Sequence, residues 1–134
     1  KTYVDYEKLL LSKNLKPGYP LLHHTYCGAD YLYSYVIEPK GNMYKCWNEV
    51  GIEKYRIGNI GTCEDYEKLI KNPNQNYAKF LTWSPFNFEK CRECSSLPIC
   101  AGGCPYNGHR AGEPVCERWK YVLGDYIKLT CDAS

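Results

Sequence analysis

The sequence lacks the features that would place it in a membrane or on nucleic acid. No apolar stretch approaches the ~20 residues that a membrane-spanning helix requires. The 17 basic and 15 acidic residues leave a net charge of +2 and form no basic run, so we expect no nucleic-acid partner. No signal-peptide pattern is present, and the chain opens on Lys1. We therefore expect a cytoplasmic location, no membrane partner, and a piece of a longer protein.

Large aliphatic side chains are also scarce. Much of the apolar content comes from 14 tyrosines, and a chain of 134 residues buries only one modest core. The nine cysteines are an odd number, so they cannot form a complete disulfide framework within one chain. Their close spacings are typical of metal ligands rather than of disulfide scaffolds. A metal or iron–sulfur site would therefore help to organise the fold.

The residue pattern predicts an α+β fold, with a small β-hairpin, short helices, a cysteine-rich cluster-binding loop and a C-terminal helix. The run Pro39-Lys40-Gly41-Asn42 predicts the turn of the hairpin. The predicted strands cover residues 31–38, 43–48 and 55–60. The predicted helices cover residues 2–12, 62–71 and 75–82, a loop covers 91–113, and the last helix begins at Pro114.

Seven of the nine cysteines form one spaced array that carries the chemistry. The array runs Cys27-x13-Gly41-x4-Cys46, continues as Cys91-x2-Cys94-x5-Cys100-x3-Cys104, and ends at Cys116. Thiolates at these spacings indicate a metal site. The ending Cys100-Ala101-Gly102-Gly103-Cys104-Pro105 is similar to the bacterial ferredoxin motif, in which the fourth cysteine ligates a different cluster from the first three.

This analogy divides the array into two groups. Cys91, Cys94 and Cys100 would hold one cluster, and Cys104 would reach toward another. Cys116 is expected in the first turn of the last helix, where the helix dipole favours a thiolate. It is therefore the natural fourth ligand beside Cys91, Cys94 and Cys100. The remaining set is Cys27, Cys46 and Cys104. A zinc knuckle formed by Cys91, Cys94, Cys100 and Cys104 is the alternative, because zinc accepts this spacing.

The array and the residues between its cysteines resemble the seven-cysteine signature of the SPASM domain. This domain is the C-terminal extension of many radical S-adenosylmethionine enzymes. The similarity includes a Pro-x-Gly hairpin before Cys46 and the run Ile57-Gly58-Asn59-Ile60 ahead of a short helix. The resemblance implies two auxiliary [4Fe–4S] clusters. Cys27, Cys46 and Cys104, here named the hairpin group, would hold the first; Cys91, Cys94, Cys100 and Cys116, the loop group, would hold the second.

The sequence departs from this family in two places. Some members carry an eighth cysteine six residues ahead of the first, and Leu21 stands at that position here. The fourth ligand of the first cluster would then be absent, be supplied by His24, or come from the substrate. Radical S-adenosylmethionine chemistry also needs a C-x3-C-x2-C site, which this sequence lacks. The chain alone is therefore not expected to cleave S-adenosylmethionine. Cys63 and Cys131 have no role in either group.

The resemblance implies an auxiliary domain of an enzyme that modifies a peptide or protein, serving substrate binding and electron transfer. Its partners would be a radical S-adenosylmethionine catalytic domain, in cis or in trans, and a peptide or protein substrate. Residues 1–20 would be a linker and helix from a preceding region, and residues 21–134 the cluster domain. The alternatives are a stand-alone iron–sulfur electron carrier or peptide-binding partner, and a structural zinc-binding module.

Overall fold

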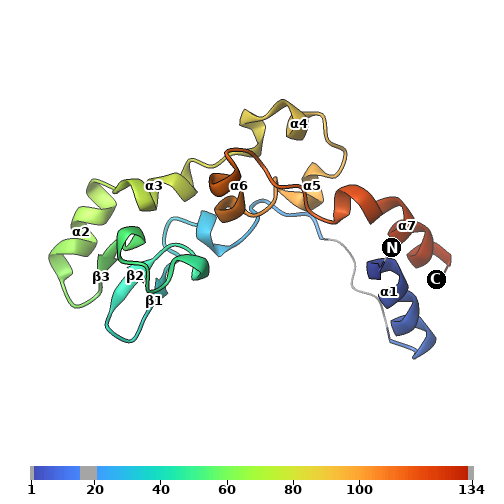
Figure 1. The fold of residues 1–134 in the computed structure, drawn as a ribbon, viewed down its shortest axis with the longest axis horizontal. Helices are drawn as coiled ribbons and strands as arrows, with labels where there is room; N and C mark the ends of the chain where they lie inside the picture. Colours follow the sequence, from blue (N-terminus) through green and yellow to red (C-terminus); the bar gives the residue numbers. More distant parts are fainter. Residues whose placement is uncertain (1, 16–20, 133–134) are drawn as a thin grey trace.

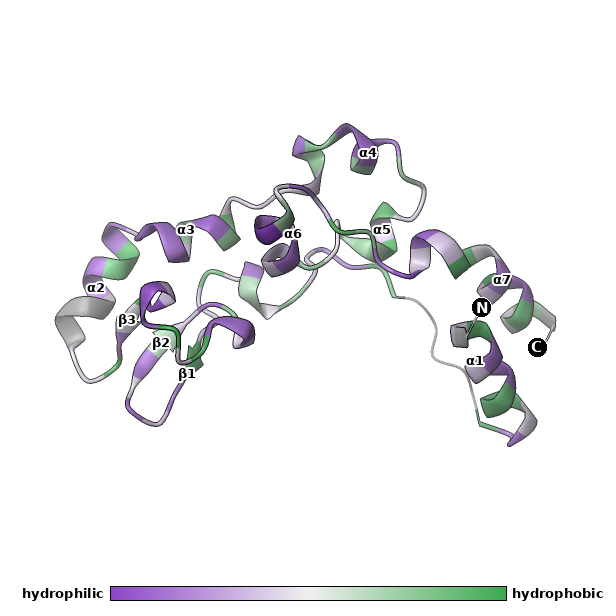
Figure 2. Ribbon diagram, viewed as in Figure 1, coloured by the Kyte–Doolittle hydropathy of each residue, from purple (hydrophilic) through white to green (hydrophobic). Residues whose placement is uncertain are grey.

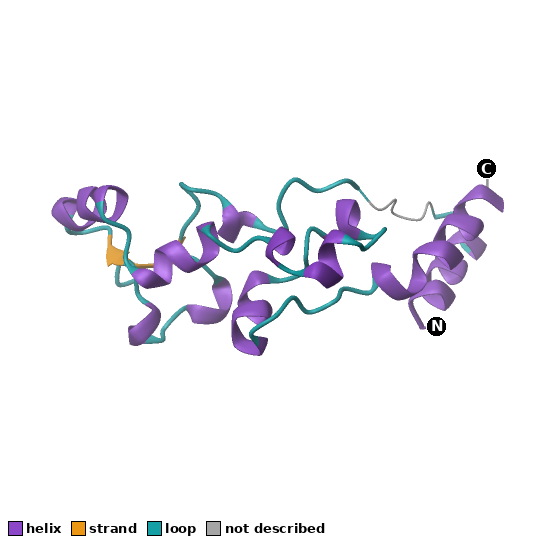
Figure 3. Cartoon of the chain, turned by 90° about the horizontal axis from the view of Figure 1, so that it is seen from above, coloured by secondary structure: helices purple, strands orange, loops and turns teal. Residues whose placement is uncertain are grey.

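The chain is elongated, with a small sheet and helices at one end, a helix pair at the other, and the cysteine-rich segment with short helices between them (Figure 1). The computed structural model describes residues 2–15 and 21–132, and within these all side chains except those of residues 2, 63–66 and 132. The small sheet lies at one end with helices α2 (Cys63–Lys71) and α3 (Gln75–Leu81), and helices α1 (Thr2–Ser12) and α7 (Trp119–Asp132) lie at the other. Figure 3 shows the same elongation from a perpendicular direction.

The predicted hairpin is confirmed, and so is a third short strand. Strands β1 (Val36–Ile37), β2 (Asn42–Tyr44) and β3 (Gly58–Asn59) form an antiparallel sheet in the order β1-β2-β3. Val36 lies opposite Tyr44, and Met43 lies opposite Gly58. Gly41 has a φ of +82°, a conformation that glycine adopts without strain, and closes the predicted turn. These features support the α+β class.

All three strands are shorter than predicted, the first most of all. Residues 31–33 form a bend and a turn after the 3₁₀-helix η1 (Gly28–Asp30), and residues 34–35 are coil. The buried Lys45 ammonium donates to the carbonyl oxygens of Tyr31 at 2.5 Å and Ser34 at 2.9 Å. These carbonyls therefore bond a side chain rather than a neighbouring strand, and the segment bends around the lysine.

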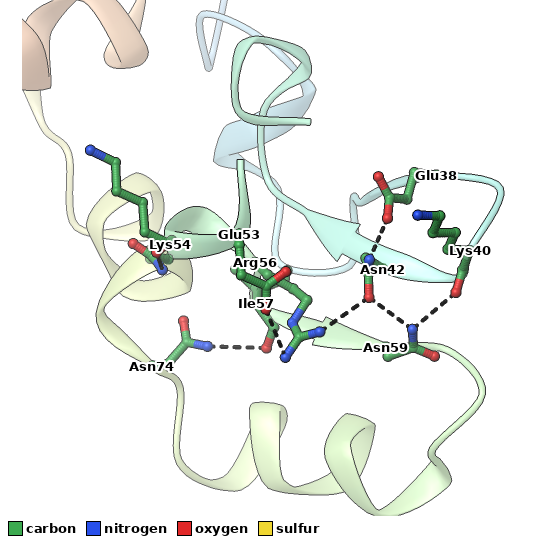
Figure 4. Close-up of polar contacts among 10 residues, drawn as sticks. Glu38, Lys40, Asn42, Glu53, Lys54, Arg56, Ile57, Asn59 and Asn74 are labelled. Atoms are coloured by element: carbon green, nitrogen blue, oxygen red, sulfur yellow. Dashed lines mark hydrogen bonds and ion pairs between the residues drawn. The ribbon is translucent and has the colours of Figure 1, made fainter. Parts of the chain in front are cut away.

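Asparagine side chains hold the sheet to the segments around it (Figure 4). Asn59 Nδ2 donates to Asn42 Oδ1 at 2.9 Å and to the Lys40 carbonyl at 3.1 Å, so it joins β3 to β2 and to the hairpin turn. Asn74 donates to the Ile57 carbonyl at 3.0 Å and, through its own Oδ1, caps the start of α3. The sheet and α3 are therefore fixed relative to each other by specific hydrogen bonds.

The apolar core at this end is small and partly aromatic. Met43, Ile57, Leu69 and Tyr77 form a buried cluster between the sheet and helices α2 and α3. Both helices lie within one residue of their predicted bounds, although only α2 was expected from apolar spacing. Figure 2 shows that hydrophobic residues are scattered along the chain rather than gathered in one large core.

The expectation that residues 91–113 form a loop is wrong. This stretch contains the end of α4 (Glu89–Arg92), α5 (Leu97–Cys100) and α6 (Pro105–Ala111), and α4 follows the 3₁₀-helix η4 (Pro85–Asn87). Helices of four to seven residues are too short to produce a detectable apolar period. Local signals do mark α6, because Pro105 lies in its first turn and Gly112 ends it with a φ of +75°.

The last helix begins later than predicted. Helix α7 starts at Trp119 rather than at Pro114, so Cys116 lies in the coil before the helix and not in its first turn. Proline favours a first helical position but does not require one, and here the chain stays extended to reach the cysteine-rich segment. The helix-dipole argument for Cys116 therefore does not apply.

Helices α1 and α7 pack against each other through aromatic rings. The Tyr3 ring centroid lies 5.7 Å from that of Trp119 and 6.0 Å from that of the buried Tyr126. Arg118 lies over the Tyr3 ring at 4.2 Å, a favourable cation–π distance. The proposed boundary near residue 20 stays a prediction, because residues 16–20 lie outside the described part. Every described helix is too short or too polar to span a bilayer.

Candidate metal centre

The three thiols of the hairpin group are brought together by three separate segments. Cys27 immediately precedes η1, Cys46 follows β2 and precedes the 3₁₀-helix η2 (Trp47–Glu49), and Cys104 precedes α6. Cys46 is buried in a cluster with Ala29 and Phe80, and Cys27 packs against that cluster. The sheet, α3 and α6 therefore converge on one site.

Burial and neighbouring charges raise the pKa values of two thiols in the hairpin group. Burial raises the pKa of Cys27, and the charges of Asp30, Cys104 and Cys46 raise it further. Burial is also the main reason that the pKa of Cys46 is raised, with Glu49 and Cys104 adding to the effect. The thiolates of Cys27 and Cys46 are thus destabilised by burial and by neighbouring negative charge, and a bound cation would offset this cost.

Side chains next to these thiols fix the local backbone. Asp30 Oδ2 accepts from the backbone N–H groups of Tyr26 at 3.0 Å and Cys27 at 3.3 Å. The Asn48 amide donates to Cys46 Sγ at 3.8 Å. Hydrogen bonds to ligand sulfur are a known means of tuning iron–sulfur potentials, so Asn48 is placed to act on whatever Cys46 ligates.

The four thiols of the loop group line one small cavity. Cys91 lies in α4, Cys94 just after it, Cys100 at the end of α5, and Cys116 in the coil before α7. All four contribute to the cavity wall, together with Gly102 and Pro114. Burial raises the pKa of Cys91, and the nearby Cys100, Cys116 and Cys94 thiols raise it further.

Two lysines lie beside the loop group. Lys90 and Lys120 both line the same cavity as the four thiols. Lys120 Nζ lies 3.8 Å from Cys116 Sγ, and Lys90 Nζ donates to Glu113 Oε2 at 2.6 Å. A group of thiolates is negatively charged, so these ammonium groups favour the form that binds a metal.

The Ala101-Gly102-Gly103 run turns the chain between the two groups. All three residues have positive φ, at +49°, +84° and +76° in order. A Cβ on Gly102 would lie 2.5 Å from Pro85 Cβ, and one on Gly103 would lie 2.2 Å from the Val115 carbonyl oxygen. The glycines therefore permit close approach of protein segments, and Gly102 also lines the cavity of the loop group.

A hydrogen bond that the sequence did not predict joins the two groups. Tyr26 Oη donates to Glu117 Oε1 at 2.7 Å, and these residues are neighbours of Cys27 and Cys116. Burial is the main cause of the raised pKa of Tyr26, with Glu117 and the thiols of Cys104 and Cys27 adding to it. Only the position of both residues beside ligand cysteines marks them in the sequence.

The four cysteines of the alternative zinc knuckle are not placed around one site. Burial raises the pKa values of Cys27 and Cys46, and the charge of Cys104 raises both further. Cys116 instead lines one cavity with Cys91, Cys94 and Cys100. Across residues 2–15 and 21–132, no three His, Cys, Asp or Glu side chains converge tightly enough to hold a single metal ion.

Among the described residues, the structure shows no contact between the remaining candidate residues and the thiols of either group. His24 is exposed and lines a neighbouring cavity, and Leu21 is exposed. Cys131 is exposed on α7, away from both groups. The Cys63 side chain lies outside the described residues.

Comparison with known proteins finds similarity to sulfatase-maturating enzymes. No protein-family profile matches the chain, and no solved structure matches it. A cysteine-type anaerobic sulfatase-maturating enzyme of Clostridium perfringens is 34% identical over 71 residues, which cover 52% of this chain and 18% of that enzyme. The enzyme of the same name from a second strain is 33% identical over 70 residues, with the same shares. The match thus spans less than a fifth of either relative, while half of this chain is similar to part of a protein-maturing enzyme.

Proposed function

We propose that this chain is the auxiliary iron–sulfur domain of a radical S-adenosylmethionine enzyme that modifies a peptide or protein. The carrying observation is the sorting of seven thiols into two groups, with Cys104 in the hairpin group and Cys116 in the loop group. The similarity to sulfatase-maturating enzymes supports a protein-modifying role. The catalytic domain, in cis or in trans, and the peptide or protein substrate would be its partners.

The arrangement of the thiols suits clusters better than single ions. A zinc ion holds four sulfurs at about 2.3 Å from one point. A [4Fe–4S] cluster instead binds each thiolate through a different iron, so its ligands surround a volume. The four loop-group thiols line the same small cavity, so all four can contribute to one cluster there. We therefore assign one [4Fe–4S] cluster to each group.

The residues of the chain would hold and tune these clusters. When bound, the clusters supply one-electron transfer. Lys120 would offset negative charge at Cys116, Asn48 would donate to Cys46, and the Tyr26–Glu117 hydrogen bond would keep the two groups in register. The hairpin group offers three thiols, so its cluster has a coordination position for His24, water or a substrate atom. We place the substrate on that side of the domain.

Iron content tests this proposal directly. Anaerobic reconstitution should give about eight irons per chain, because each of two clusters carries four. Cys104→Ser and Cys94→Ser should each lower the iron content by about four, since each removes a ligand from a different group. Cys131→Ser is the matched control, because Cys131 is exposed and lies in neither group.

Three outcomes would contradict all or part of the assignment. One or two zinc ions in protein from iron-replete cells would replace it by the structural zinc module. About four irons in the wild type, lost on Cys94→Ser and kept on Cys104→Ser, would leave only the loop group as a cluster site. An equal loss of iron on Cys131→Ser would show that iron binding does not depend on membership of these two groups.

A further inference from the structure

A cavity of about 620 Å³ lies between the segments that carry the two cysteine groups. Its wall comes from residues 23–26 just before Cys27, from residues 80–86 at the end of α3 and in η4, and from residues 97–101 around α5. The backbone N–H of His23 donates to the Pro98 carbonyl at 2.9 Å and joins the first of these segments to the last. The volume falls within the range of about 300–1,000 Å³ that is usual for ligand sites.

One side of this cavity is aromatic and held in place. Phe80 is fully buried, Trp83 is half-buried, and Phe86 is 64% exposed. The Trp83 ring lies 5.4 Å from Phe88 and 4.7 Å from His109. A Cβ on Gly108 would lie 2.3 Å from the Trp83 ring, so the glycine lets the indole sit tightly against α6. The rings thus form a preorganised apolar surface, which lowers the entropic cost of binding.

The cavity wall also contains an unpaired acceptor and an unpaired donor. Asp30 Oδ2 is occupied by backbone N–H groups, but its buried Oδ1 has no partner among the described residues. The buried indole N–H of Trp83 likewise has none in this part of the chain. Buried polar groups without partners are uncommon and call for an explanation. A peptide group carries one N–H and one C=O, which are the two kinds of partner that these atoms lack.

We propose that this cavity binds an extended segment of the substrate peptide, with an apolar side chain against Phe80, Trp83 and Phe86. Asp30 and Trp83 belong to the wall that would face the peptide backbone, and the exposed His24 lines the same cavity. This inference rests on the proposed function, because it names where the substrate of that enzyme binds. It makes Phe86 a specificity-determining residue that selects an apolar neighbour of the modified residue.

The test uses the reconstituted full-length protein and a set of blocked heptapeptides. Each peptide has a central cysteine and glycine elsewhere, except for one leucine placed at a different position in each. Isothermal titration should show that one leucine position binds at least about tenfold more tightly than the all-glycine parent. Phe86→Ser should remove that preference, and Phe86→Leu should restore most of it because an apolar side chain returns.

Trp47→Ser is the matched control, since Trp47 is an aromatic residue that is 80% exposed and lies outside the cavity. Its affinities should equal those of the wild type. The proposal is overturned if no peptide binds the wild type, if Phe86→Ser keeps the leucine preference, or if Trp47→Ser loses it equally. Iron analysis of the same samples separates failure of the peptide site from failure of the proposed function. If the iron content is complete but Phe86→Ser keeps the leucine preference, only the peptide site is rejected.

Discussion

The two cysteine groups differ in what holds them together. The hairpin group is anchored by the sheet, by the Asp30 hydrogen bonds and by a buried cluster containing Phe80. The loop group sits on α4, α5 and a coil, where the helices have four residues each. Helices this short are not stable by themselves. The comparison teaches that protein packing shapes the first site, whereas the second depends on the metal that it would bind.

The groups also differ in the charges beside them. Asp30 and Glu49 raise the pKa values of Cys27 and Cys46, although Lys45 lies close to Cys27 as well. Lys90 and Lys120 line the cavity of the loop group. Negative neighbours oppose electron uptake by a cluster and positive neighbours favour it, so the two sites would respond differently to the loss of one charge.

The largest expected effect comes from removing a loop-group ligand. Cys94→Ala or Cys116→Ala should leave residues 91–113 disordered, because the metal supplies most of the free energy that orders this segment. The hairpin should keep its structure. Limited proteolysis should then cut residues 91–113 at least about tenfold faster than in the loaded wild type.

The reciprocal variant sharpens this comparison. Cys27→Ala removes a hairpin-group ligand and should leave proteolytic resistance of residues 91–100 unchanged, since the loop group stays complete and Cys104 lies beyond this stretch. Equal resistance in the Cys94→Ala and Cys27→Ala proteins would show that the loop is held by packing, and the contrast between the groups would fail.

A smaller effect is expected where the two groups touch. Gly103→Ala places a Cβ 2.2 Å from the Val115 carbonyl oxygen at a φ of +76°. Strain and overpacking should together cost about 3 kcal/mol in the free energy of unfolding, measured by urea denaturation of the loaded protein.

Gly112→Ala is the matched control for this change. Gly112 has nearly the same φ, +75°, but a Cβ there would meet nothing within 4 Å. Only the backbone strain remains, which should cost about 1 kcal/mol. Similar losses in both variants would mean that the close approach of Gly103 to Val115 contributes little to joining the groups.

The smallest effect concerns charge at the loop group. Lys120→Gln removes the ammonium that lies 3.8 Å from Cys116 Sγ and should lower the midpoint potential of the second cluster. An exposed charge contact of about 0.5–1 kcal/mol corresponds to about 20–40 mV for one electron. Redox titration followed by electron paramagnetic resonance measures the shift.

Lys128→Gln serves as the control, because Lys128 is an exposed lysine on the same helix. It should leave both potentials unchanged. A shift of the first cluster with Lys120→Gln, or an equal shift with Lys128→Gln, would show that net charge rather than the contact with Cys116 sets the potential.

Sequence reasoning predicted the elements whose signal is local. Gly41 marked the hairpin turn, and apolar spacing marked helix α2. It failed for α4, α5 and α6, which are too short to show a period, and for the start of α7. It also missed that Lys45 bends residues 31–34, because that contact joins residues that no local pattern connects.

The sequence by itself supplied the prediction of which residues carry the chemistry. Cysteine spacing and the Cys104-Pro105 ending can be read directly from the sequence. They allowed the seven candidate ligands to be divided into two groups without coordinates. Only the tertiary structure decided what surrounds them: the Tyr26–Glu117 hydrogen bond, the lysines at the loop group, and the cavity with Phe86 and Trp83. These contacts join residues far apart in the chain, and their formation depends on packing and burial rather than on spacing along the sequence.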